Sequence, residues 1–326
     1  MAVMTYREAL NRALEEEMAR DERVFLMGEE VGEYDGAYKV SRGLLVKYGP
    51  KRVIDTPISE LGFTGIGIGA AIAGLRPVVE WMTHNFAILA MDQVINNAAK
   101  MRHMSGGQLK VPIVFRGPNG PAEYLSSQHS QSLAAFWMHV PGLKVVAPAT
   151  PYDAKGLLKS AIRDDDPVVM LEAELMYAWE GEVPEEEYLV PIGKADIKRP
   201  GKDVSVITYS KPLKVVMEAA KVLEERGVDV EVVDLRSLRP LDTETIFSSV
   251  RKTHRAVVVD EAWPMCGPAS FVAWAVGKAC FDDLDAQVEI VTSEDVPMPY
   301  NHTLELAVQS SVEKVVAAVS RVLYLE

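Results

Sequence analysis

One acid stands out because of the segment that surrounds it. Glu60 follows an apolar run that ends at Asp55 and a Thr-Pro turn, and it precedes a segment rich in glycine and alanine, residues 62–74. Pro57 fixes φ and removes a hydrogen-bond donor, so the strand must end before it. Small side chains let backbones approach closely and favour a tightly packed helix. We therefore expect Glu60 to enter the core ahead of that helix, where burial raises the pKa of a carboxyl.

Two other interpretations of this stretch remain open. Glu60 can be an ordinary acid in the first turn of a helix, where the helix dipole stabilises its charge. Gly65, Gly67 and Ala70 also match the dinucleotide fingerprint G-x-G-x-x-G/A formally. A true fingerprint follows its strand directly, whereas here Pro57 and further polar residues intervene, so a nucleotide phosphate site is disfavoured.

His129 is the second candidate for chemistry. It lies in a polar Gln-His-Ser-Gln segment, residues 128–131, beyond an expected strand at 111–115. Loops at the carboxyl ends of parallel strands are where such folds bind ligands, although a surface histidine without function is the alternative. The remaining histidines have no metal-ligand spacing: His84, His103, His139, His254 and His302.

Three consecutive acids form a third feature. Asp164, Asp165 and Asp166 follow an expected helix at 151–163 and precede Pro167. A helix end carries unpaired carbonyl groups and a partial negative charge, so acids are unfavourable there. A hard cation on these oxygens would remove the repulsion, and a solvated acidic turn is the alternative.

Composition and missing motifs exclude several classes of protein. The net charge of −13 argues against a nucleic-acid partner, and no apolar run is long enough to span a membrane. The two cysteines, Cys266 and Cys280, indicate neither a disulfide framework nor a zinc site, and we expect a cytoplasmic protein. There is no Walker loop and no G-x-S-x-G elbow. A Gly-Asp-Gly segment followed by paired asparagines, as expected where thiamine diphosphate and its magnesium are held, is also missing.

The elements alternate along the chain and predict an α/β fold with parallel sheets and helices on both faces. A capping box at Thr5 and Glu8 opens the first helix. Strands are expected at 24–27, 77–82, 111–115, 143–147, 168–171, 204–208, 230–234, 256–259 and 288–291, and helices at 62–74, 86–102, 151–163 and 312–323. An acidic, proline-containing stretch separates the halves, so we expect domains at 1–180 and 203–326 joined by a linker at 181–202.

Ten segments together resemble the β subunit of thiamine-dependent 2-oxo acid dehydrogenases, most of all the pyruvate enzyme. The resemblance covers nearly the whole chain and is carried by residues 28–31, 35–40, 55–60, 69–71, 74–77, 104–107, 113–120, 128–131, 141–146 and 295–300. It implies two doubly wound domains, an N-terminal pyrimidine-binding domain and a C-terminal transketolase-like domain. It also implies an α2β2 heterotetramer whose α subunit holds the diphosphate and Mg2+ of thiamine diphosphate, and docking to a dihydrolipoyl acetyltransferase core.

The resemblance assigns roles to single residues. It implies that Glu60 bonds the N1′ nitrogen of the cofactor, with Glu29 behind it, and that Phe86 stacks on the pyrimidine ring. It implies that His129 faces the substrate and guides proton transfer or the incoming lipoyl group. A potassium site in relatives implies carbonyl ligands at Ile113, Ala161, Ile162, Asp164 and Asp166.

Departures from the family pattern leave alternatives open. His84 and His103 stand where relatives often have phenylalanine and tyrosine, and His84 precedes Phe86 by two residues. A branched-chain 2-oxo acid or acetoin dehydrogenase is the alternative within the family. A non-catalytic subunit that only stabilises the α chain is the alternative outside it.

Overall fold

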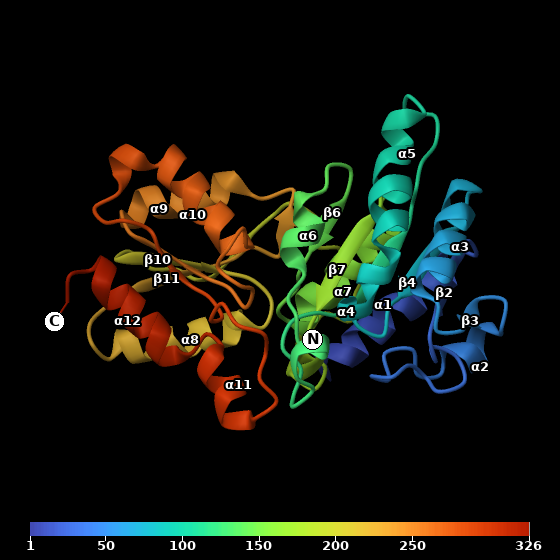
Figure 1. The fold of residues 1–326 in the computed structure, drawn as a ribbon, viewed down its shortest axis with the longest axis horizontal. Coiled ribbons are helices and arrows are strands. Elements are labelled where there is room, and N and C mark those ends of the chain that lie inside the picture. The colour runs from blue at the N-terminus through green and yellow to red at the C-terminus, as the bar shows by residue number, and fades with distance from the viewer. Residues whose placement is uncertain (326) are drawn as a thin grey trace. The chain divides into compact units, whose positions relative to one another are not determined.

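Strands and helices alternate along the whole chain, as a computed structural model of residues 1–325 shows (Figure 1). The residues group into two units. Unit 1 comprises Met1–Asn119 and Phe136–Ile192, and unit 2 comprises Gly120–Ala135 together with the chain from Gly193 onward. No helix in the described part of the chain is long and apolar enough to cross a membrane.

Unit 1 is built on a parallel sheet in which the strands lie in the order β6-β7-β5-β4-β2-β3. Their bounds are β2 (Val24–Gly28), β3 (Val53–Asp55), β4 (Arg76–Glu80), β5 (Val114–Pro118), β6 (Lys144–Val146) and β7 (Val168–Glu172). A separate antiparallel pair joins β1 (Ala2–Thr5) to β8 (Glu180–Val183). The parallel α/β fold expected from the alternation is confirmed.

Helices cover both faces of this sheet. Their bounds are α1 (Tyr6–Arg20), α2 (Leu44–Tyr48), α3 (Glu60–Ile72), α4 (His84–Ala87), α5 (Ala99–Met104), α6 (Ala134–His139) and α7 (Pro151–Arg163). The helices α1 and α7 bury Leu10 and Leu157 against strand residues such as Leu26 and Val78. The helix α3 packs on the opposite face, where a Cβ added to Gly67 would lie 2.8 Å from Val79. Glycine therefore permits the close approach that the sequence predicted for this helix.

Three expectations about elements of unit 1 have clear outcomes. The capping box is confirmed, because Thr5 accepts a hydrogen bond from the N–H of Glu8 and the Glu8 side chain bonds back. The strand expected at 111–115 begins later, at Val114, since Pro112 cannot donate to a sheet and the chain turns before it. The helix expected at 86–102 runs from 84 to 104, but 3-10 and π turns interrupt it.

Unit 2 has its own sheet, with strand order β14-β13-β10-β11-β9. The strands are parallel except for β9 at one edge. Strand bounds in this unit are β9 (Asp196–Arg199), β10 (Val204–Thr208), β11 (Val230–Asp234), β12 (Ser237–Arg239), β13 (Ala256–Val259) and β14 (Glu289–Val291). The helices are α8 (Pro212–Glu224), α9 (Thr243–Thr253), α10 (Pro268–Ala279), α11 (His302–Val308) and α12 (Val312–Val322). Within this unit α8 and α12 cover one face of the sheet and α9 and α10 the other (Figure 1).

The expected boundaries at 180 and 203 remain a prediction. The stretch 181–202, expected to be a linker, contains most of β8 and all of β9. Residues 120–135 group with unit 2 although they precede the expected boundary. This grouping matters for His129, which lies in that segment.

Candidate active site

The carboxyl ends of β2 and β3 determine where Glu29 lies. A Cβ on Gly28, the last residue of β2, would lie 2.4 Å from the carbonyl oxygen of Glu80 in β4, so this approach requires glycine. Asp55 ends β3, and its carboxylate accepts the N–H of Gly32 at 2.5 Å. The loop that follows Gly28 is thereby tied to the edge of the sheet, and Glu29 is only 6% exposed.

Glu60 meets Glu29 at this edge. It is the first residue of α3, and it is 5% exposed. The expectation of a buried acid is thus confirmed, and Glu60 also lies in the first turn of the helix, the position that the alternative interpretation gave it. The carboxyl of Glu29 lies within hydrogen-bonding reach of Glu60. Two acids separated by 31 positions in the chain therefore form one buried pair.

A shared proton is the chemical consequence of this pairing. Burial, followed by the charge of Glu60 and the hydrogen bond with it, raises the pKa of Glu29 from 4.5 to about 7. Two adjacent buried carboxylates cannot both be ionised cheaply, so Glu29 takes up a proton near neutral pH. Such a group can donate and accept a proton under ordinary conditions.

One oxygen of the pair lacks a partner. Oε1 of Glu29 is buried and makes no hydrogen bond among the described residues. Phe86 in α4 is 37% exposed, and the turn that follows it, Ile88–Ala90, packs against α3. A planar ring with a nitrogen that exchanges a proton fits this set, since the carboxyls suit the nitrogen and a phenyl ring suits the ring face.

His84 belongs to the core and not to this site. Its ring packs edge-on against Trp81 at 5.3 Å, and its Nε2 lies 3.2 Å from the carbonyl oxygen of Met170. Burial, with a smaller effect of the Arg116 charge, lowers its pKa to about 4. The ring is therefore neutral at physiological pH and acts by packing. His103 is exposed near the end of α5.

A buried ionic cluster joins three strands at the same sheet edge. Arg116 in β5 is 1% exposed and donates hydrogen bonds to Glu80 of β4 and to Glu172 of β7, the latter at 2.6 Å from Nε. The hydroxyl of Tyr177 donates to Glu172 at 2.8 Å, and Tyr38 stacks on the Tyr177 ring. Burial, only partly offset by Arg116, raises the pKa of Glu80. The cluster connects the sheet to the loop that begins with Glu29, because Tyr38 lies in that loop.

His129 lies in unit 2. It is half-buried and ends a short 3-10 turn, Ser127–His129. The hydroxyl of Ser127 donates to the carbonyl oxygen of Met298 at 2.9 Å. Glu29, Glu60 and Phe86 all lie in unit 1, so the structure brings the first two together but assigns His129 to the other unit.

The acidic turn has side-chain cations of its own. Arg76 donates to the carbonyl oxygens of Ile162 at 2.9 Å and Asp164 at 2.8 Å. Lys144 pairs with Asp164 and Asp166, Arg102 with Asp166, and Lys110 with Asp165. The charge repulsion that suggested a metal ion is thus already relieved within the chain. The carbonyls of Ile113 and Ala161 also accept backbone hydrogen bonds, from Val168 and Asp164.

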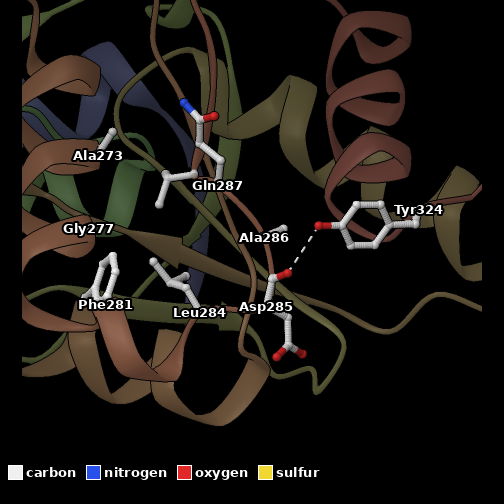
Figure 2. Close-up of a pocket in the computed structure, with 9 residues that line it drawn as sticks. Ala273, Gly277, Phe281, Leu284, Asp285, Ala286, Gln287 and Tyr324 are labelled. Atoms are coloured by element: carbon white, nitrogen blue, oxygen red, sulfur yellow. Dashed lines mark hydrogen bonds between the residues drawn. The ribbon is translucent and has the colours of Figure 1, made fainter.

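A separate hollow of about 670 Å3 opens on unit 2 (Figure 2). Its lining is mostly apolar, with Phe281, Leu284 and Val288 among its residues. Tyr324 crosses one side and donates to the carbonyl oxygen of Asp285 at 3.2 Å. The described residues that line this hollow include no acid–base pair, so the carboxyl pair of unit 1 is the better candidate for catalysis.

Sequence reasoning placed Glu29 behind Glu60 but missed the Arg116 cluster. The signal was present, since Glu80, Arg116 and Glu172 are charged residues at the ends of apolar runs. Charged side chains at the ends of buried strands are rarely buried unless they are paired. Two acids and one arginine in such positions therefore predict that the three side chains form one ion-paired cluster.

Comparisons with known proteins agree with this geometry. Residues 2–178 match the family model of the transketolase pyrimidine binding domain, and residues 193–315 match that of the transketolase C-terminal domain. A solved structure described as a split gene transketolase, inactive beta4 tetramer, has the same fold, with a TM-score of 0.79, 23% identity and 99% coverage of both chains.

Curated relatives are more similar in sequence. The pyruvate dehydrogenase E1 component subunit beta of Rickettsia felis is 53% identical, and the alignment covers 98% of each chain. The mitochondrial subunit beta of Caenorhabditis elegans is 55% identical over 98% of this chain and 92% of its own length. The mitochondrial subunit beta-2 of Oryza sativa is 55% identical over 98% of this chain and 86% of its own length. The chain therefore belongs to the family of pyruvate dehydrogenase E1 component β subunits, within the thiamine-dependent 2-oxo acid dehydrogenases.

Proposed function

We propose that this chain is the β half of a thiamine diphosphate-dependent enzyme that decarboxylates pyruvate. The acetyl group then passes to a lipoyl arm of dihydrolipoyl acetyltransferase and on to coenzyme A. The observation that carries the proposal is the buried Glu29–Glu60 pair, in which the pKa of Glu29 is raised to about 7. Its position in a chain of this family supports a proton-transfer role, because a catalytic pKa near the working pH is the most effective one.

Each proposed site residue has a distinct task. Glu60 hydrogen-bonds N1′ of the aminopyrimidine, and Glu29 keeps a proton available behind it. The half-exposed ring of Phe86 supports the pyrimidine face. When bound, the thiazolium ring supplies the nucleophile for the oxo carbon and accepts the electron pair that loss of carbon dioxide leaves behind.

His129 serves the second half of the reaction in this proposal. An imidazole can exchange a proton near neutral pH, and His129 is half-buried at the end of a short 3-10 turn. It guides proton transfer at the substrate or at the incoming lipoyl group.

Partner subunits complete the site. The sequence lacks the diphosphate and magnesium motif, so an α subunit holds these groups in an α2β2 assembly. The outward face of α3 supports such a partner, since Leu61 and Ile66 are 49% and 66% exposed. The acidic C-terminal region receives a basic subunit-binding domain of the acetyltransferase core. That docking should weaken as salt is raised, and docking that ignores ionic strength would contradict it.

Pyruvate is favoured over the alternative substrates. The curated relatives described above are all named as pyruvate dehydrogenase subunits, not as branched-chain or acetoin enzymes. A subunit that only stabilised its partner would have no use for a buried carboxyl pair, which costs folding free energy. The cytoplasmic location remains a prediction, and several relatives carry a mitochondrial label.

The potassium site also remains a proposal. Carbonyl oxygens have a second lone pair, so Ile113, Ala161, Ile162, Asp164 and Asp166 can still contribute ligands beside their present hydrogen bonds. Potassium should then raise the melting temperature more than an equal concentration of tetramethylammonium. Identical melting curves in the two salts would contradict the potassium site. They would mean that Arg76 and the neighbouring lysines hold this turn without a metal ion.

Replacement of the central acid tests the function directly. Glu60→Gln, co-expressed with the α subunit, should assemble normally but release carbon dioxide from pyruvate about 10²–10⁴-fold more slowly, because a positioned proton-transfer group is lost. Glu33→Gln is the matched control, since Glu33 is exposed in the neighbouring loop. Near-normal turnover of the Glu60 variant would show that Glu60 does not have the proposed proton-transfer role.

Substrate choice needs a second measurement on the unsubstituted complex. Turnover with pyruvate should exceed turnover with 2-oxoisovalerate. Faster turnover with 2-oxoisovalerate than with pyruvate would indicate a branched-chain 2-oxo acid dehydrogenase subunit. The proposed role of Glu60 would stay the same.

A further inference from the structure

The loop that carries His129 is bound by unit 2, although it lies within the stretch that matches the N-terminal family model. Residues 120–135 group with unit 2, whereas the pyrimidine-binding model spans 2–178. The loop is closed on itself. The N–H of Gly120 donates to the carbonyl oxygen of Gln131 at 2.9 Å, and Ser130 bonds the backbone of Ala122. These hydrogen bonds tie the two ends of the loop together, so contacts made by its outer part also constrain the segment that carries His129.

Two hydrogen bonds and one ring contact hold the outer part to α11 and the segment before it. Ser127 donates to the carbonyl oxygen of Met298 at 2.9 Å, and the N–H of Tyr124 donates to Oε2 of Glu305 at 3.2 Å. The Tyr124 ring also packs edge-on against His302, with 4.8 Å between the ring centroids. Both hydrogen bonds flank His129 on its N-terminal side.

The backbone of this loop would not keep its shape unaided. Tyr124 and Ser126 have φ angles of 60° and 62°, in the left-handed region that residues with side chains rarely adopt. Such conformations persist only where the surroundings impose them. Tyr124 is held by the hydrogen bond to Glu305 and the ring contact with His302, and Ser126 lies next to Ser127, which bonds Met298.

The acid that holds the loop is itself held by charge. Glu305 is 4% exposed, and its negative charge acts on Lys211. The Nζ of Lys211 lies 3.8 Å from Oε2 of Glu261 and donates to Oε1 of Gln309 at 2.8 Å. Gln309 in turn donates to the carbonyl oxygen of Glu305 at 3.1 Å. Lys211 thus pairs with Glu261 and, through Gln309, connects to the backbone of Glu305, the residue that the loop rests on.

The same lysine supports the other end of the loop through Glu261. A Cβ on Gly120 would lie 2.4 Å from Oε1 of Glu261, and Gly120 has a φ of 81°. The first residue of the loop therefore lies directly on Glu261, and only glycine fits there. Gly120 thus rests on Glu261, which pairs with Lys211, and Tyr124 rests on Glu305.

We propose that Glu305, which accepts a hydrogen bond from the Tyr124 N–H, is a positioning residue that sets the place of His129 from the C-terminal unit. The inference rests on the role of His129 in the proposed function. The C-terminal unit then has a part in the acetyl-transfer step beyond assembly, because it holds the loop on which that step depends.

Hydrogen exchange measured on the full chain tests the anchor without any activity assay. In Glu305→Ala the amides of residues 120–131 should exchange about tenfold faster, as expected when a hydrogen bond to a charged group is lost. Glu305→Gln should restore most of the protection, because its amide oxygen still accepts the Tyr124 N–H. Ser127→Ala should accelerate the same peptide to a smaller extent. Glu218→Ala, an exposed glutamate on α8, is the matched control and should change nothing in this peptide.

Unchanged exchange at 120–131 in Glu305→Ala overturns the proposal, and so does an equal acceleration throughout unit 2. In the complete complex, Glu305→Ala should slow acetylation of a lipoyl domain more than it slows decarboxylation measured with an artificial electron acceptor, and Glu305→Gln should reverse the loss. If His129→Ala leaves lipoyl acetylation unchanged, the role given to His129 fails, while the exchange result still decides the anchor.

Discussion

At the scale of single residues, the proposed chemistry rests on two acids that the fold places together. Glu29 and Glu60 are both at least nine-tenths buried, and their proximity creates a titratable group that neither would form alone. A carboxyl whose folded-state pKa lies above its unfolded value favours folding less as pH rises between the two values. The pair to which we assign the proton-transfer role therefore costs stability near neutral pH.

The pH dependence of stability should reveal this cost. The pKa of Glu29 is about 7 in the folded chain against 4.5 for the unperturbed side chain, so the penalty develops as pH rises from about 4.5 to 7. Glu29→Gln has no such penalty. Its melting temperature relative to the unsubstituted chain should therefore be higher at pH 7.5 than at pH 5. Glu33→Gln should show a constant difference, and a constant difference for Glu29→Gln would mean that this carboxyl ionises normally.

At the scale of elements, the ends of the strands carry the site. The strands β4, β5 and β7 are joined at their carboxyl edge by Arg116, which pairs with Glu80 and Glu172. The loop of Glu29 starts at the same edge and connects to this cluster through Tyr38 and Tyr177. Rigid strand ends thus support a loop that must hold its acid in one place.

Loss of the buried cation should be costly, and loss of a surface one should not. Arg116→Leu leaves two buried carboxylates without their partner, so the free energy of unfolding should fall by about 3–5 kcal/mol. Arg102→Leu removes an exposed pair with Asp166 and should cost at most about 1 kcal/mol. Urea unfolding of the two variants gives both numbers. Equal losses in the two variants would show that the cluster is not held by charge.

At the scale of the whole molecule, the chain presents part of a site. Its acids and its apolar α3 face are in place, but the sequence lacks the residues that would bind a diphosphate with magnesium. In the proposed function, a partner subunit contributes the charged end of the cofactor site.

Cofactor affinity should accordingly depend on assembly. Calorimetry should detect little thiamine diphosphate binding to the isolated chain, and much tighter binding after addition of the α subunit with Mg2+. Micromolar binding to the isolated chain would contradict this division of labour.

The sequence by itself determined the alternation of strands and helices, because buried parallel strands are continuous apolar runs whatever their neighbours are. It also singled out Glu60 and His129, since proline, glycine and polar residues mark the ends of those runs. Only the tertiary structure decided that Glu29 pairs with Glu60, that Arg76 bonds the carbonyls of the acidic turn, and that the His129 loop rests on Glu305. Each of these contacts joins residues that are 31 to 181 positions apart in the chain. Local pattern reports which residues can do chemistry, whereas the register of the sheets and the packing of the helices decide which of them meet.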